Sequence, residues 1–259
     1  MKSKTLYLIL LLMLAALPAT AADAAAMAAR AAMAYDKELY NEALKLYRQA
    51  EKEGGSSSML CYNMGNTCYR LKDNAHAILY YERALLLDPS NGDARFNLEF
   101  VREKAQINDT SGDSFFSDWL GGLVSRLSSN TWATVAIVAF IAMLLLAAVY
   151  LFLDHVLLRK VGFFGAIVML VVTLAANACA YHMHSKAVNR SDAIVTAERA
   201  TLSTSPRTPK DKTEEAMTLG AGHKVQIVDS VNNAGTRWLD VRTPDGQRAW
   251  ISAQDVEVI

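Results

Sequence analysis

The chain has 259 residues, of which 52% are hydrophobic, and its 26 basic residues balance its 26 acidic ones. A balanced charge implies no general electrostatic attraction to nucleic acid, so nucleic acid is not an expected partner. The three cysteines are too few and too far apart for a disulfide framework, because Cys61 and Cys68 lie about 10 Å apart on one predicted helix and Cys179 falls in an apolar run.

The N-terminus has the composition of an export signal. Lysines at positions 2 and 4 precede an apolar run over residues 6–17, and Pro-Ala-Thr-Ala at 18–21 puts small residues where a signal peptidase reads them. Residues 1–22 are therefore expected to be a signal peptide. Whether it is cleaved stays open, but an uncleaved segment leaves the same parts of the chain outside the cytoplasm.

A 34-residue spacing marks the next part of the chain. Alanine and tyrosine recur at this offset in three pairs: Ala43 and Ala77, Tyr47 and Tyr81, Ala50 and Ala84. Self-similarity at this period predicts tetratricopeptide repeats, which are antiparallel helix pairs whose stacking makes a groove for other polypeptides. The alternative is that these residues form the core of an ordinary helical bundle.

The repeat domain is assigned to residues 23–107, about two repeats and a capping helix. The second unit fits best, with Gly65 where two helices approach closely and Asp88-Pro89 as the helix stop. The first helix of the first unit is degenerate. A third first-type helix is expected over residues 93–106, with charged residues outward as the polar cap that solenoids need.

Three asparagines on the inner helices are candidates for a partner-binding groove: Asn63, Asn66 and Asn97. Two of them fall on sites that bear asparagine in tetratricopeptide proteins that clamp a C-terminal carboxylate. The matching cationic sites fall on Met59 and Asp93, so a clamp for chaperone tails is not expected. The asparagines either hold a partner's backbone or bond between repeats.

Two apolar stretches without charge predict transmembrane helices at 131–153 and 161–181, since each is long enough at about 1.5 Å per residue to cross a hydrocarbon core of about 30 Å. Residues 154–160 are then a cytoplasmic loop with two basic residues. Together with the export signal, this loop places the repeats and the C-terminal part on the outer side of the inner membrane, in the periplasm.

Residues 108–130 are expected to be a linker with an interfacial amphipathic helix. Its aromatic side chains Phe115, Phe116 and Trp119 recur at helical spacing and are suited to the headgroup zone of the bilayer. An extension of the first span, or packing against the repeats, stays open as an alternative.

After a linker at 182–190, short alternating strands separated by turn residues predict a small barrel over residues 191–259. Its landmarks follow the order of bacterial SH3-like domains, including Trp238-x-x-Val241-Arg242 and the pair Trp250-Ile251, although Ala249 stands where a glycine is usual. Trp238 and Trp250 are its candidate binding surface. Proline-rich peptides fit poorly, because they need a groove lined with aromatic residues. Cell-wall binding and plain protein docking remain open.

No catalytic signature is found. The chain has no Gly-x-Ser-x-Gly elbow, His-Glu-x-x-His pair, Walker loop or Cys-x-x-Cys motif. The segment His182-Met183-His184 lacks a further ligand at metal-site spacing. We therefore expect no enzyme activity, no catalytic or metal-binding residues and no cofactor.

The order of signal, repeats, interfacial helix, membrane hairpin and barrel resembles the BatE-like proteins of the Bacteroides aerotolerance operon. The segments that carry the resemblance most clearly are residues 62–70, residues 93–99 and the Trp-Ile pattern of the barrel. The resemblance implies a membrane system with von Willebrand A-type proteins and, indirectly, a MoxR-type ATPase, linked to oxygen tolerance or envelope stress.

The predicted fold class is a multidomain membrane protein with an all-α tetratricopeptide repeat solenoid, a two-helix transmembrane hairpin and a small all-β SH3-like barrel. The leading hypothesis for its function is a non-enzymatic scaffold that binds envelope proteins and contacts the lipid bilayer. The alternative is a peptidoglycan-binding sensor led by the barrel. A third hypothesis, an accessory subunit of an envelope hydrolase, requires a catalytic partner.

Overall fold

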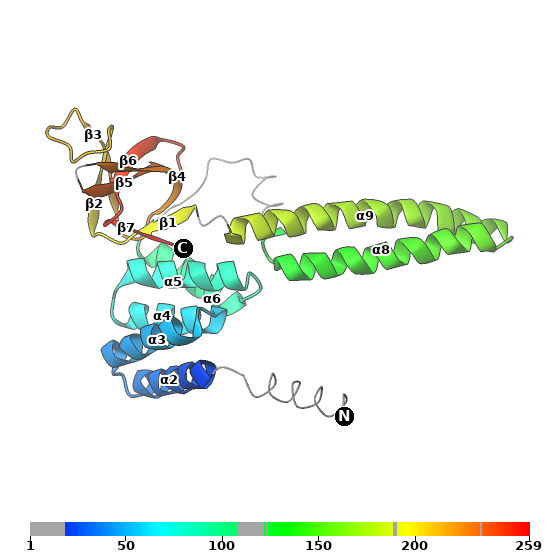
Figure 1. Cartoon of the computed structure of the whole chain (residues 1–259), viewed down its shortest axis with the longest axis horizontal. Coiled ribbons are helices and arrows are strands. Elements are labelled where there is room, and N and C mark those ends of the chain that lie inside the picture. Colours follow the sequence, from blue (N-terminus) through cyan, green and yellow to red (C-terminus); the bar gives the residue numbers. More distant parts are fainter. Residues whose placement is uncertain (1–18, 108–121, 123, 189–190, 234) are drawn as a thin grey trace, which may run out of the picture.

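The computed structural model describes residues 19–107, 122, 124–188, 191–233 and 235–259 (Figure 1). It contains stacked helices, a pair of long apolar helices and an antiparallel β-sheet domain, which confirms the predicted fold class. Residues 1–18 of the expected signal peptide, and residues 108–121 and 123 of the expected interfacial segment, lie outside the described residues.

The repeat domain consists of five stacked helices: α2 (Ala19–Asp36), α3 (Tyr40–Gly54), α4 (Ser58–Arg70), α5 (Asn74–Leu87) and α6 (Gly92–Lys104). The last three begin after Ser57, Asp73 and Asn91, whose side chains accept hydrogen bonds of 3.2, 3.1 and 3.0 Å from backbone N–H groups in the first helical turn. Such caps satisfy otherwise unpaired donors and each stabilise a helix by about 1 kcal/mol.

The backbone repeats as regularly as the sequence. Glu38, Lys72 and Gln106 are 34 residues apart, and all three have positive φ angles of 63°, 64° and 56°. In each turn, the N–H of the following residue bonds to the carbonyl five positions before it, at 2.9, 3.0 and 3.0 Å. This left-handed turn ends a helix while pairing its last carbonyls. The three inner helices therefore end in the same way.

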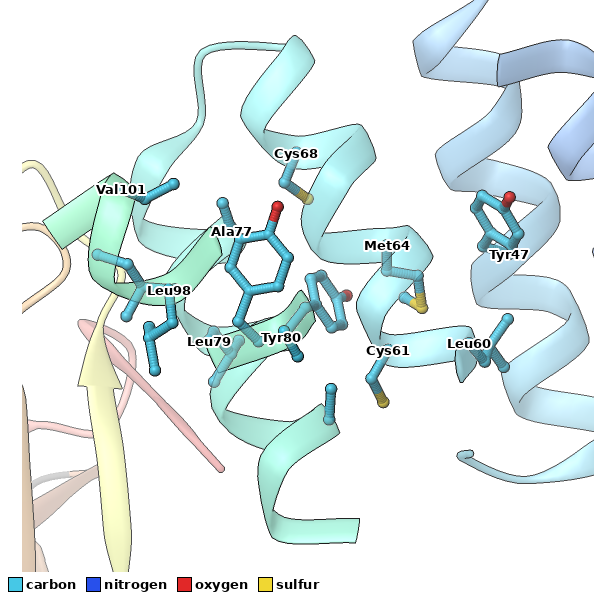
Figure 2. Packing of buried hydrophobic residues seen from close by; sticks show 14 of the residues in the cluster. Tyr47, Leu60, Cys61, Met64, Cys68, Ala77, Leu79, Tyr80, Leu98 and Val101 are labelled. Atoms are coloured by element: carbon cyan, nitrogen blue, oxygen red, sulfur yellow. The ribbon is translucent and has the colours of Figure 1, made fainter. Parts of the chain in front are cut away.

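Close packing between α4 and α5 depends on Gly65. A Cβ atom added there would lie 2.6 Å from Cε1 of the buried Tyr81. Figure 2 shows Met64 and Cys68 of α4 between α3, which carries Tyr47, and α5, which carries Tyr80. The glycine lets the two helices approach closely enough for these buried side chains to pack against one another.

The membrane hairpin is formed by α8 (Ser129–Phe152) and α9 (Val156–Val188), both long and apolar enough to span a bilayer. A Cβ atom at Gly162 would lie 2.7 Å from the Leu146 carbonyl oxygen, so the two backbones nearly touch there. The connection is only residues 153–155. Arg159 and Lys160 thus lie in the first turns of α9 instead of in a loop.

The C-terminal domain has seven strands: β1 (Asp192–Val195), β2 (Arg199–Ser203), β3 (Glu215–Gly220), β4 (Lys224–Asn233), β5 (Thr236–Arg242), β6 (Arg248–Ser252) and β7 (Val256–Val258). Their order in the sheet is β3-β2-β6-β5-β4-β1-β7, and all the pairs are antiparallel. Buried aliphatic side chains such as Leu202, Val241 and Ile251 fill its core. The alternation seen in the sequence therefore separates the inside of the barrel from its outside.

The barrel is packed directly against the last helices of the solenoid, next to α5 (Figure 1). Ile194 and Ile259 are buried and belong to the hydrophobic cluster of the repeats instead of that of the barrel. Gly222 contacts Ile78 and Ile107 so closely that a Cβ atom would lie 3.0 and 2.5 Å from their Cδ1 atoms. We call this contact the seam. The sequence predicted a polar cap facing solvent and gave no sign of this contact.

The packing at Gly65 predicts that Gly65→Leu destabilises the repeats by about 3 kcal/mol or more, because the new side chain overlaps the buried Tyr81 ring. Thermal unfolding of the full chain in detergent, followed by circular dichroism, measures the change. Gly92→Leu is the matched control, since no atom lies within 4 Å of a Cβ there. Equal melting temperatures for the two variants would contradict the proposed role of Gly65.

Candidate functional site

The inner helices of the solenoid, α2, α4 and α6, carry exposed apolar side chains. Met59 on α4 and Phe96 and Phe100 on α6 are 65%, 69% and 46% exposed. Phe96 and Phe100 are one helical turn apart, and Phe96 lies 34 residues after Tyr62. Large apolar side chains gathered on one face of a soluble domain mark an interaction surface. We call the face that includes these residues the groove.

Two of the three predicted asparagines bond to each other across repeats. The Asn97 amide nitrogen donates to Oδ1 of Asn66 at 2.9 Å, and the Tyr81 hydroxyl donates to the same oxygen at 2.7 Å. Burial raises the pKa of Tyr81, so its hydroxyl stays protonated and can donate. This contact fixes the register between α4 and α6.

Asn63 differs from Asn97, although the two occupy equivalent repeat positions. Asn97 finds Asn66 in the preceding unit, whereas the residue in the preceding unit that would meet Asn63 is Ala32, whose methyl group cannot form a hydrogen bond. Within the described part of the chain, no hydrogen bond involves the half-buried Asn63 amide side chain. Of the three asparagines, Asn63 retains the most capacity to bond to a partner's backbone.

One end of the groove combines aromatic and cationic side chains. The rings of Tyr69 and Phe100 meet edge to face with centroids 5.9 Å apart. Lys104 Nζ lies 2.9 Å from the Tyr69 hydroxyl and 4.9 Å from its ring centroid. Sequence reasoning missed this feature, although the 34-residue offset from Tyr62 to Phe96 is a signal that would have located the aromatic face.

The two tryptophans of the barrel have unequal surroundings. Trp238 on β5 is only 6% exposed, whereas Trp250 on β6 is half-buried. In the sheet, Trp250 lies opposite Ser203 of β2 and Asp240 of β5. Of the two, only Trp250 offers appreciable surface to a ligand. A binding role for either residue stays a prediction.

Ion pairs surround the apolar centre of the seam. Arg83 of α5 pairs with Glu257 of β7 at 3.0 Å and also donates to the Val258 carbonyl. Since β7 is an edge strand of the sheet, Arg83 covers part of its open edge.

A second group of charges also lies at the seam. Glu82 of α5 contacts Arg102 of α6 at 2.7 Å and Lys224 of β4 at 3.4 Å, and Lys224 contacts Asp192 of β1 at 3.0 Å. Burial alone would lower the pKa of Lys224, but the two carboxylates outweigh it and raise that pKa. The charges are thus paired where the two modules meet.

A titratable group, His76 of α5, also faces the seam. Its Nδ1 lies 2.8 Å from Oδ2 of Asp73, and its Nε2 lies 3.7 Å from Oε2 of Glu257. The close contact with the Asp73 carboxylate raises the pKa of His76 and outweighs its burial, Glu257 adds to the increase, and Arg48 opposes it. Protonated His76 therefore links the N-terminal cap of α5 to the barrel.

The described residues contain no group of three or more His, Cys, Asp and Glu side chains placed to hold a metal ion. The cysteines are free, and Cys61 and Cys68 are buried in the repeat core. Burial raises the pKa of the Cys61 thiol to about 11 and that of the Cys68 thiol to about 12. Both thiols are therefore protonated at neutral pH and poorly nucleophilic.

A cleft of about 890 Å³ lies where the seam meets the end of the hairpin opposite the α8–α9 turn. Its lining combines three acidic with three basic residues: Glu82, Glu99, Asp192, Arg95, Arg102 and Lys224. This balance favours neither an anionic nor a cationic ligand.

The contacts of His76 predict a pH-dependent contribution to stability. Because its pKa is raised in the folded state, the contribution is fully present below about pH 6.5 and is lost as the pH rises through the raised value. Burial would raise the pKa of the Asp73 carboxyl, but the contacts with His76 outweigh it and lower that pKa, so the carboxylate is ionised at both pH 5.5 and pH 8.5. His76→Gln should therefore lower the stability by roughly 0.5–1 kcal/mol at pH 5.5 and by less at pH 8.5.

Thermal unfolding of the full chain in detergent at the two pH values measures this difference. His155→Gln, in the turn of the hairpin, is the control variant. A loss for His76→Gln that is larger at pH 8.5 than at pH 5.5 would show that the sign is wrong.

Comparison with known families identifies two modules. Residues 58–91 match the tetratricopeptide repeat family, and residues 208–257 match the bacterial SH3 domain family. A search of curated proteins finds no match. Both families are typically non-catalytic interaction modules, and no enzyme family is indicated. The chain therefore carries a tetratricopeptide repeat, predicted from the 34-residue spacing, and a bacterial SH3 domain, predicted from the strand landmarks.

Proposed function

We propose that this protein is a non-enzymatic, membrane-anchored scaffold whose repeats and barrel bind other proteins of the cell envelope. The observation that carries the proposal is the groove, where Met59, Phe96 and Phe100 are exposed beside the unbonded amide of Asn63. Apolar side chains supply affinity for a partner, and a free amide can pair with its backbone. We propose Asn63, Asn66 and Asn97 as groove residues, with the last two positioning the helices.

The seam supports a topology in which both modules face the same side of the bilayer. Arg83 and Glu257 can meet only if the repeats and the barrel are on one side, and two crossings return the chain to the side from which it started. The expected export signal favours the outer side, and Arg159 and Lys160 at the tip of the hairpin suit the cytoplasmic side. We therefore propose a multi-pass protein of the inner membrane with both modules in the periplasm.

The domain boundaries follow from the same reasoning. We propose a signal peptide over residues 1–22, a repeat domain over 23–107, an interfacial linker over 108–130 and an SH3-like domain over 191–259. Between them, spans over 131–153 and 161–181, joined by the cytoplasmic residues 154–160, hold the modules at the membrane surface, with residues 182–190 linking the second span to the barrel. Confinement to this surface raises the effective concentration of both modules for other membrane-bound proteins.

The domain order also supports membership of a BatE-like membrane system. We propose von Willebrand A-type proteins as partners and a MoxR-type ATPase as an indirect one, in an aerotolerance or envelope-stress complex. The support is the resemblance described for residues 62–70 and 93–99, combined with the two matched modules.

Site-specific photo-crosslinking tests groove binding. A photoreactive residue at Asn63 or Phe96 should capture the same partner from native membranes, because both positions face the groove. Lys45, exposed on the outer helix α3, is the control position. The captured protein is identified by mass spectrometry. Labelling at Lys45 that matches labelling at the other two positions would count against binding in the groove.

The second candidate function is a cell-wall sensor, favoured by the bacterial SH3 match and by the half-exposed Trp250. Sedimentation of the full chain in detergent with purified peptidoglycan separates the two functions. The full chain is required because removal of the repeats would uncover Ile194 and Ile259. We expect the protein to stay in the supernatant. Sedimentation that is abolished by Trp250→Ala and retained in Arg242→Ala would favour the sensor.

A further inference from the structure

Among the residues that the structure describes, the aromatic end of the groove has a cation without a carboxylate partner, whereas the equivalent cation in the preceding repeat is paired with a glutamate. Arg70, at the end of α4, contacts Glu38 at 3.7 Å and lies 4.7 Å from the centroid of the Tyr40 ring. Lys104 is the equivalent residue at the end of α6, 34 positions later. In the described part of the chain, no carboxylate pairs with the Lys104 ammonium group, which bonds to the Tyr69 hydroxyl.

The reason is a charge reversal within the repeat. The residue equivalent to Glu38 is Lys72, and the two have the same left-handed conformation, with φ angles of 63° and 64°. Because the two turns share this backbone conformation, we expect Lys72 to lie near Lys104, as Glu38 lies 3.7 Å from Arg70. One repeat therefore ends in an internal ion pair, and the next ends in two exposed cations.

The two cations adjoin an apolar surface. Lys104 stands one helical turn after Phe100, and both contact the Tyr69 ring. An anionic side chain bound here would be attracted by both Lys104 and Lys72. An apolar side chain next to it could pack on the exposed faces of Phe96 and Phe100. Exposed cations attract a carboxylate with little desolvation cost, because they stay in contact with water.

We propose that the groove binds an extended segment of another polypeptide in which an acidic side chain lies next to an aromatic or large aliphatic one, with Lys104 and Lys72 contacting the acid. The segment lies across α4 and α6, its apolar side chain rests on Phe96 and Phe100, and its backbone bonds to the Asn63 amide. This inference rests on the proposed groove function and defines the chemistry of the partner.

Selection from a random peptide library displayed on phage tests the proposal. The target is the full chain in nanodiscs of zwitterionic lipid, so that no anionic lipid competes for the lysines. The peptides are fused to the phage through their C-terminal ends, so that any preference for acid reports on side chains and not on a terminal carboxylate. The dissociation constants of the enriched peptides are then measured for each variant.

Enriched peptides should carry Asp or Glu beside an aromatic or large aliphatic residue. Lys104→Glu should weaken their binding at least tenfold, and a new selection on this variant should enrich basic peptides instead. Lys45→Glu, the same charge change on an outer helix, should alter the dissociation constants less than twofold. Circular dichroism confirms that the exposed substitutions leave the fold intact.

Two results separate the failure of this inference from the failure of the proposed function. In the first, Phe96→Ser weakens peptide binding, but the peptides show no acidic preference or bind Lys104→Glu as well as the wild type. This result would overturn the inference and leave the groove as a binding site. If every enriched peptide bound Phe96→Ser and the wild type equally well, the groove function itself would be refuted.

Discussion

The arrangement of the molecule depends on how the apolar end of a helical stack is covered. A solenoid buries each helix between its neighbours, so its last helices have an apolar face without a successor. Here Ile194 and Ile259 of the barrel enter the core of the repeats and fill this place. The ion pairs of Arg83 and Glu82 surround the contact. As a result, two modules that are separate in sequence form one body, and the groove has a fixed position relative to the barrel.

Within the repeats, the residues proposed for binding lie where equivalent positions differ. The backbone turns at Glu38, Lys72 and Gln106 are nearly identical, so they present side chains in the same geometry three times. A carboxylate in the first of them neutralises a neighbouring cation, whereas a lysine in the second leaves two cations exposed. The pair Asn63 and Asn97 shows the same principle, since only one of the two meets a partner. The regular packing holds the helices in place, and the side chains proposed for binding lie where the sequence departs from the repeat.

Local patterns in the sequence were enough to predict the repeats, the two spans and the barrel. The repeat spacing, the length of the apolar runs and the alternation in the strands can all be recognised along the sequence. The close helix packing at Gly65 was predicted in the same way, from its position in the repeat. The seam was not predictable in this way. Arg83 and Glu257 are 174 positions apart, and no periodicity marks them as partners. Likewise, the sequence left open whether Asn66 faces a ligand or another repeat, because the answer depends on the distance between α4 and α6.

The seam also has a consequence for biogenesis. In the proposed topology, the repeats are synthesised first, then the two spans and finally the barrel, so the apolar face beside Ile78 stays uncovered until both spans have entered the membrane. If the second span failed to insert, the barrel would lie on the opposite side of the membrane from the repeats. The apolar face of the last repeat helices would then stay exposed to chaperones and proteases. In that proposed topology, the seam can form only after both spans are correctly inserted.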